Sequence, residues 1–354
     1  MIKQRILDTV KEREMAPMYV TLTKQFGWKM DENLLSELKK KNEQKLKELD
    51  EKFVDAEKNA GEYEVFEAAT EKSNYLSSIG DKVAMQKAFE LVKEKAFSSG
   101  QKIDASFNVM RNAYMHNDLD MMKEALEGSK RLVEEGGDWD RRNRRRVYEG
   151  VYKLSQRDIS SATELFLSAV ATFTSFEMIS YESLIAYTVL TSMISLDRAS
   201  LKEKVVKNSD VLSTIGKIPY LNELLHAFYE CRYRDFFVAL VGIHPYMLRD
   251  RLLSRHASFF VRELRIIAYK QLLQSYQSVR LDSMAKTFGV SVDFLDSELS
   301  RFIGVKRLAA KIDKVAGVIE TNRPDAKNAQ YNDIIKHGDA LLNQIHRLTR
   351  AIRV

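Results

Sequence analysis

One short motif recurs three times in the first half of the chain, and it constrains the fold more than any other feature. Segments 80–91 (GDKVAMQKAFEL), 117–128 (NDLDMMKEALEG) and 157–168 (RDISSATELFLS) each place an Asp eight residues before a bulky apolar residue. The pairs are Asp81 and Phe89, Asp118 and Leu126, and Asp158 and Phe166. An Asp at this position suits a helix N-cap, because its carboxylate accepts a hydrogen bond from a first-turn amide. Copies 37 and then 40 residues apart predict an α-solenoid of helix pairs, whose units bury their apolar faces only against neighbours.

The composition agrees with a mainly helical chain. Only 4 of the 354 residues are Pro, so few helices are interrupted by a residue that lacks a backbone donor. The net charge of +6 is spread along the chain, which permits nucleic-acid binding without requiring it. No apolar run reaches the roughly 18 residues of a membrane span, and the N-terminus lacks a secretory signal pattern. We therefore expect a protein of the cytoplasm and nucleus that does not bind a membrane.

Changes in pattern divide the sequence into four expected parts. Residues 1–58 form an N-terminal helical segment that includes a charged, amphipathic helix over 29–58. Residues 59–245 form the helical-repeat arm. Residues 246–324 form a winged-helix region, and residues 325–354 form a C-terminal helix that serves assembly.

The winged helix is predicted from residues 281–322. Four apolar residues lie on one face of a first short helix: Leu281, Met284, Ala285 and Phe288. Gly289 can take the left-handed conformation that ends this helix, and a second helix is expected to start at Asp293. Residues 308–322 then change to a period of two around a turn at Gly317, which predicts a β-hairpin.

The charge of the second helix argues against nucleic-acid recognition. In a winged helix that reads DNA, this helix offers Arg, Lys, Asn or Gln to base edges. Here it carries Asp293, Asp296 and Glu298 against Arg301 alone. The predicted wing is basic at Lys306, Arg307, Lys311 and Lys314, so contact through the wing stays open as an alternative. We expect the helix to contact protein.

A second basic run, residues 141–146 (RRNRRR), contains five arginines. A nuclear-localisation patch and a phosphate-binding stripe are both open. Consecutive residues point around a helix, however, so these arginines cannot all face one ligand. We favour an exposed face or a local salt-bridge network, and we expect Trp139 to pack into the repeat stack.

The last helix carries an apolar seam with no later partner in the sequence. Its members are Ile334, Gly338, Leu341, Ile345, Leu348 and Ile352, which alternate at spacings of four and three residues. This heptad pattern is typical of helices that pack against other helices.

No residue pattern nominates an active site. None of the six histidines has the H-x-x-x-H spacing of a zinc helix, and the glycines form no phosphate-binding loop. Cys231 lies in an apolar stretch and is expected to be a buried structural thiol. We expect no enzymatic activity, no metal and no cofactor.

Five long stretches resemble the PCI family of scaffold proteins, and within it the non-ATPase subunits of the proteasome regulatory-particle lid. They are MAPMYVTLTKQFGWKMDENLL (15–35), EEGGDWDRRNR (134–144), FYECRYRDFF (228–237), FGVSVDFLDSELSRFI (288–303) and KIDKVAGVIETNRPDAKN (311–328). The resemblance implies a mainly α fold: a right-handed, TPR-like solenoid of helix pairs, then a winged-helix PCI module with a small β-hairpin and a C-terminal helix. It implies a non-catalytic subunit in ubiquitin-dependent protein degradation.

The resemblance also implies the partners. They are other PCI-domain lid subunits and the lid's metalloisopeptidase pair, with the regulatory-particle ATPases as further candidates. A PCI subunit of the signalosome or of a translation initiation factor is the alternative within the family. A nucleic-acid-binding winged-helix protein is the alternative outside it.

Two surfaces are the expected interfaces. In the wing they comprise Ala310, Ile312, Val318 and Ile319, and in the tail helix Leu341, Leu342, Ile345, Leu348 and Ile352. The alternative for the wing residues is a place in the core of the winged helix itself, since strand alternation buries one face in any case. The alternative for the tail is packing against its own domain.

Overall fold

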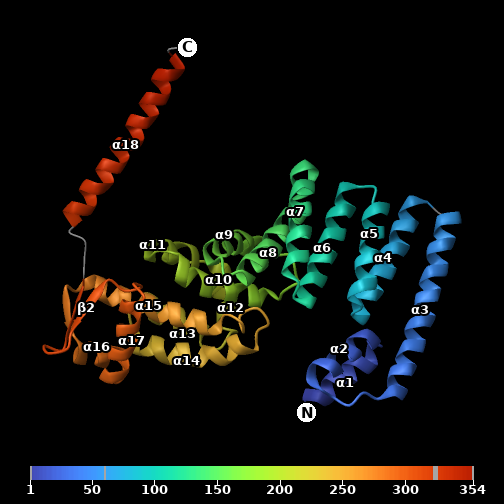
Figure 1. The fold of residues 1–354 in the computed structure, drawn as a ribbon, viewed down its shortest axis with the longest axis horizontal. Coiled ribbons are helices and arrows are strands. Elements are labelled where there is room, and N and C mark those ends of the chain that lie inside the picture. The colour runs from blue at the N-terminus through green and yellow to red at the C-terminus, as the bar shows by residue number, and fades with distance from the viewer. Residues whose placement is uncertain (1, 60, 322–325, 353–354) are drawn as a thin grey trace. The chain divides into compact units, whose positions relative to one another are not determined.

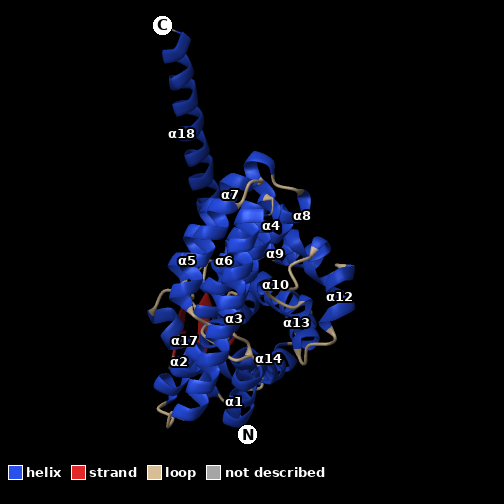
Figure 2. Cartoon of the chain, turned by 90° about the vertical axis from the view of Figure 1, so that its right-hand side faces the viewer, coloured by secondary structure: helices blue, strands red, loops and turns tan. Residues whose placement is uncertain are grey.

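The computed structural model describes residues 2–59, 61–321 and 326–352, and the chain forms two compact units, residues 1–184 and 185–354 (Figure 1). Helices dominate both, and the strands form one small sheet in the second (Figure 2).

The first unit is a series of helices in which α4 to α9 pack as antiparallel pairs (Figure 1). The helices are α1 (Ile2–Glu12), α2 (Ala16–Phe26), α3 (Glu32–Asn59), α4 (Glu62–Ile79), α5 (Lys82–Lys95), α6 (Ser99–His116), α7 (Leu119–Gly136), α8 (Trp139–Ser155) and α9 (Ile159–Ala169), followed by one 3₁₀ turn (Val170–Thr172). Helix α4 pairs with α5, α6 with α7, and α8 with α9. The predicted repeat of helix pairs is therefore confirmed.

The three motif aspartates are N-caps, as predicted. The Asp81 carboxylate accepts a hydrogen bond from the amide of Ala84 at 3.0 Å. The equivalent bonds run from Met121 to Asp118 at 3.1 Å and from Ser161 to Asp158 at 3.3 Å. The apolar partners Phe89, Leu126 and Phe166 are all buried. Each motif thus starts the second helix of a pair and anchors it two turns later.

Ion pairs join successive helix pairs along the surface of this unit. Lys82 lies 2.7 Å from Asp118, one repeat further on. Lys95 reaches Glu57 at 2.7 Å, and Arg141 reaches Asp104 at 2.8 Å. These side chains are partly exposed, so each pair contributes about 0–1 kcal/mol, and the apolar core between repeats supplies most of the stability.

The helices of the third pair, α8 and α9, are in close contact at Gly150 of α8. A Cβ atom at this position would lie 2.6 Å from the ring of Phe166 on α9. The two helices can therefore approach only because residue 150 has no side chain.

The second unit contains further helices and the sheet. Its elements are α10 (Tyr181–Ser195), which crosses the boundary between the units, α11 (Arg198–Leu201), a π-helix (Lys202–Val206), α12 (Ser209–Ile215), α13 (Leu221–Tyr229), α14 (Tyr233–Arg249), α15 (Ala257–Ser275), β1 (Ser278–Arg280), α16 (Leu281–Phe288), α17 (Val292–Gly304), β2 (Ala310–Asp313), β3 (Val318–Thr321) and α18 (Ala326–Ile352).

The winged helix is present, with two differences from the prediction. Gly289 closes α16 in the left-handed conformation, with φ of 69°, as expected. Helix α17 is capped by the Ser291 side chain, not started at Asp293. The sheet has three antiparallel strands in the order β1-β3-β2, and β1 was not predicted. Strand β1 is only three residues long, too short to show a period of two, and pairs with β3 about 40 residues later in the chain.

An aromatic cluster centred on Phe288 holds α16 against its neighbours. The Phe288 ring lies 4.8 Å from Tyr269 of α15 and 5.2 Å from Phe237 of α14, measured between ring centroids. Leu295, Leu299 and Phe302 bury the inner face of α17. This core fixes α16 and α17 and leaves the sheet at the edge of the domain.

A methyl group added at Gly150 should destabilise the third helix pair. In Gly150→Ala the new Cβ collides with Phe166, and we expect a loss of about 1–3 kcal/mol in local stability. Gly128 of α7 is the matched control, because nothing lies within 4 Å of a Cβ there. Gly128→Ala should gain about 0.5–1 kcal/mol from helix propensity. Amide hydrogen exchange in the two helix pairs measures both effects, and equal behaviour of the variants would contradict the packing argument.

Asp118 should make the arm sensitive to acid. The hydrogen bond from Lys82, followed by that from the Met121 amide, lowers the pKa of Asp118 below its ordinary value. A carboxylate with a lowered folded-state pKa stabilises the fold above its unfolded pKa, and this contribution disappears as the pH falls through the folded pKa. Asp118→Asn keeps a capping side chain, so its unfolding should depend less on pH in the acid range. Asp118→Ala should cost about 1 kcal/mol at neutral pH. Thermal unfolding between neutral and acid pH tests both; identical pH profiles for wild type and Asp118→Asn would refute the linkage.

Candidate interaction surfaces

A buried polar cluster fixes α17 against α15. The Glu298 carboxylate accepts a hydrogen bond from the Tyr269 hydroxyl at 2.6 Å and pairs with Arg265 at 2.7 Å. Burial, and then the bond to Glu298, raises the pKa of Tyr269 above its ordinary value. Glu298 is only 8% exposed. Glu298 therefore adds no charge to the exposed surface of α17, because its carboxylate is taken up by partners on another helix about 30 residues earlier.

Two further ion pairs hold the wing. Arg307, just before β2, pairs with Glu263 of α15, which is buried. Lys314, at the tip of the hairpin, lies 3.0 Å from Asp296 of α17. Of the four basic wing residues, these two are neutralised within the domain. Lys306 and Lys311 form no ion pair within the described residues, so the basic footprint of the wing is small.

The outward face of α17 is partly apolar. Val292 and Phe294 are 38% and 42% exposed, next to the exposed Asp293. Phe294 also lines a pocket of about 330 Å³ with Val241 of α14 and Val261 of α15. A surface of this composition suits apolar side chains of a protein better than phosphates.

The sheet presents β2 as an edge strand. Its inner side pairs with β3, from Ala310 opposite Thr321 to Asp313 opposite Val318. No strand of the described chain pairs with its outer side. Ala310 and Ile319 are buried in the domain, whereas Ile312 and Val318 are partly buried. The structure thus gives two of the four predicted wing residues a place in the domain's own core.

Helix α18 exposes all of its large apolar side chains over residues 330–352. The five predicted residues, Leu341, Leu342, Ile345, Leu348 and Ile352, are 55–77% exposed. Tyr331, Ile334 and Ile335 fall in the same range and were absent from the predicted interface. With 100° between successive residues, these eight side chains cover an arc of about 140°. This stripe is wider than the seam of a two-stranded coiled coil.

The arginine run in α8 is a local network. Arg141 pairs with Asp104 at 2.8 Å, Arg144 with Asp140 at 2.9 Å, and Arg145 with Glu149 at 2.9 Å. Three of the five charges are therefore neutralised inside the unit, which confirms the salt-bridge interpretation.

Two expectations about single residues are wrong. Trp139 is 62% exposed, because it is the first residue of α8 and precedes the first buried position, Asn143. Cys231 is only partly buried and lies in the turn between α13 and α14 with a positive φ of 62°. Its Sγ atom lies 3.2 Å from the Gln271 amide nitrogen and 3.4 Å from an Arg198 guanidinium nitrogen.

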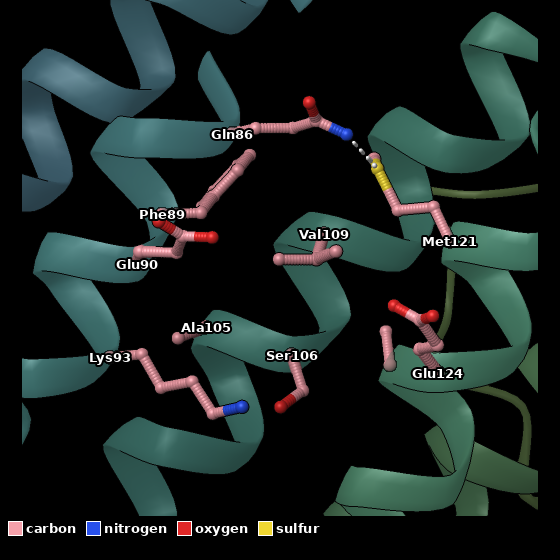
Figure 3. A pocket seen from close by; sticks show the side chains of 10 residues that line it. Gln86, Phe89, Glu90, Lys93, Ala105, Ser106, Val109, Met121 and Glu124 are labelled. Carbon is pink, nitrogen blue, oxygen red and sulfur yellow. Dashed lines mark hydrogen bonds between the residues drawn. The ribbon is translucent and has the colours of Figure 1, made fainter. Parts of the chain in front are cut away.

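The first unit also has a pocket of about 340 Å³ between α5, α6 and α7 (Figure 3). Gln86 and Met121 close one end, with 3.3 Å between the amide nitrogen and the sulfur. Glu90 and Glu124 lie on opposite walls, and the Ser106 hydroxyl donates to the carbonyl of Lys102. No nucleophile is paired with a base among the residues that line it.

Two further findings concern the part of the chain that the structure describes. There, no three His, Cys, Asp or Glu residues gather as metal ligands. Among the same residues, no helix combines the length and hydrophobicity that a membrane span requires.

Comparison with protein families assigns three segments. Residues 31–204 match the family model described as 26S proteasome subunit RPN7. Residues 242–323 match the PCI domain. Residues 330–352 match a separate model, the 26S proteasome regulatory subunit RPN7/PSMD6 C-terminal helix, which corresponds to the exposed part of α18.

Curated relatives extend over nearly the whole chain. The chain is 48% identical to 26S proteasome non-ATPase regulatory subunit 6 homolog of Arabidopsis thaliana, covering 99% of this chain and 91% of the relative. It is 39% identical to 26S proteasome regulatory subunit RPN7 of Saccharomyces cerevisiae, over 99% and 87%. COP9 signalosome complex subunit 1 of Arabidopsis thaliana is 28% identical over 50% of this chain and 39% of its own. The signalosome alternative is thus the weaker one, and the chain belongs to the RPN7 family of 26S proteasome regulatory subunits, with a PCI domain and the family's C-terminal helix.

Proposed function

We propose that this chain is a non-catalytic scaffold subunit of the lid of the proteasome regulatory particle. Its winged helix and its C-terminal helix would each bind other subunits, and its helical arm would present a third surface. The exposed apolar face of α18 carries this proposal. Eight large apolar side chains on one helix are costly to leave in water, and burial of each against a partner would contribute about 1.5–3 kcal/mol.

The width of the stripe favours several partner helices over one. In a two-stranded coil only the a and d positions are apolar, and the flanking e and g positions carry charges that select the partner. With Ile345 and Ile352 at a, the e positions of α18 hold Ile335, Leu342 and Thr349. The g positions hold His337, Gln344 and Ala351. An apolar a, d and e face without flanking carboxylates suits a bundle of more than two helices.

The second surface is the wing. The outer edge of β2 offers unpaired backbone groups that can accept a strand from another PCI domain. The Glu263–Arg307 and Asp296–Lys314 pairs hold this edge in one position. Other PCI-domain lid subunits are the proposed partners here, and the lid's metalloisopeptidase pair is proposed for the helical bundle. For the arm, the regulatory-particle ATPases are candidate partners.

Damage to α18 should prevent assembly while the rest of the chain stays folded. Deletion of residues 328–354 removes the apolar face but no residue of the two cores described above. Ile345→Glu puts a charge into the buried seam and should reduce incorporation into the regulatory particle by about tenfold or more, equivalent to about 1.4 kcal/mol. Asn343→Glu, on the opposite face, is the matched control. Quantitative mass spectrometry of purified particles measures incorporation, and normal incorporation of the deletion variant would refute the proposed function.

Removal of one side chain of the Glu263–Arg307 ion pair should destabilise the domain more than removal of both. Arg307→Met leaves the buried Glu263 carboxylate with only its longer contact to Arg262, at 3.5 Å, and should destabilise the domain by about 1–3 kcal/mol. The double change Glu263→Leu with Arg307→Met should restore most of this stability, because no charge remains buried. The double-mutant cycle compares both single variants, the double variant and the wild type. Chemical denaturation of the full chain measures their stability, and amide hydrogen exchange in β2 reports on the wing. Strictly additive losses would show that the two side chains do not interact.

A further inference from the structure

Gly338 occupies the middle of the exposed apolar face of α18. It lies one turn after Ile334 and one turn before Leu341 and Leu342. Every other residue from 330 to 352 is exposed, whereas Gly338 is partly shielded. On a helix, bulky side chains at these spacings flank a residue that has none, so the face has a depression at this point.

Nothing among the residues that the structure describes requires glycine at this position. No atom lies within 4 Å of a Cβ built at residue 338, and its φ is not left-handed. Glycine in the interior of a helix is less favourable than alanine. Gly150, by contrast, is required by the ring of Phe166.

Open space around a helical glycine does not by itself mark a binding site, because a Cβ built at Gly128 of α7 also has nothing within 4 Å. The difference lies in the neighbours. In helix packing, four residues at i, i+3, i+4 and i+7 enclose a hole that receives one side chain of a facing helix. Gly338 is the shared corner of two such holes. One is completed by Tyr331, Ile334 and Ile335, and the other by Leu341, Leu342 and Ile345.

We propose that Gly338 is a docking notch that accepts one large apolar side chain, such as Phe, Tyr, Met or Leu, from a helix of a neighbouring subunit. Without a side chain at residue 338, the two holes merge into one depression that is wholly lined by apolar groups. A heptad seam alone would allow the partner helix to slide along α18 by one seven-residue repeat. A single large side chain that fits only at Gly338 would fix the alignment of the two helices. This inference rests on the proposed scaffold function and adds how the bundle selects its alignment.

The test separates helix stability from docking. Gly338→Ala should slow amide exchange of α18 in the free full-length chain up to about fivefold, because it raises helix propensity. The same variant should compete less well than wild type for incorporation into the regulatory particle, by about threefold or more. Gly338→Leu fills the notch fully and should lose about tenfold or more. A more stable helix that assembles less well is not expected from a purely structural role.

Matched controls lie on the opposite face of α18. Asn343→Ala also raises helix propensity, and Ala340→Leu also adds a leucine, and both should incorporate within about twofold of wild type. Equal losses for Ala340→Leu and Gly338→Leu would mean that added hydrophobicity is the cause and would overturn the notch. Wild-type incorporation of Gly338→Leu would overturn it as well. If that variant and the 328–354 deletion both incorporate, the scaffold proposal fails too; if only the deletion fails to incorporate, the notch alone is wrong.

Discussion

An amphipathic helix is stable only when its apolar face is covered, and this constraint organises the whole chain. In the arm, each helix pair is covered by the next, and the Asp81, Asp118 and Asp158 caps fix where the second helix of each pair begins. In the winged helix, Phe288 is covered by Phe237 of α14 and Tyr269 of α15, and Leu295 is buried near the Glu298 cluster. Helix α18 is the exception within the described chain. Its uncovered face is the clearest sign that the stable form of this protein includes other polypeptides.

Local signals in the sequence predicted the elements well, because they act through nearby atoms. Caps such as Asp118 bond an amide three residues away, and Gly289 ends its helix by its own backbone conformation. The family resemblance and the heptad seam pointed to the same interface in α18. The predicted apolar stripe of α18 was nevertheless too narrow. A strict alternation of four-residue and three-residue spacings omits Tyr331 and Ile335, which lie beside the seam on the helix.

Features that depend on distant partners could not be predicted. The sequence around Glu298 does not distinguish it from a surface carboxylate, because its partners Arg265 and Tyr269 lie about 30 residues away on another helix. Strand β1 exists only because β3 pairs with it. Trp139 looked like a core residue by its size, but the packed part of α8 begins one turn later. In the wing, Ala310, Ile312 and Ile319 share one face of the sheet and Val318 lies on the other, and the alternation did not show that Ala310 and Ile319 belong to the domain's own core.

The ion pairs between successive repeats have a mechanical consequence. Lys95–Glu57, Lys82–Asp118 and Arg141–Asp104 each join side chains 36 to 38 positions apart, at the surface, where water and salt screen them. Such ion pairs break and re-form at little free-energy cost, so they resist small movements between neighbouring helix pairs only weakly. The arm can therefore bend by small, distributed adjustments and conform to neighbours of differing outline. Because the apolar core between repeats supplies most of the stability, a rise in ionic strength would weaken these ion pairs without unfolding the arm.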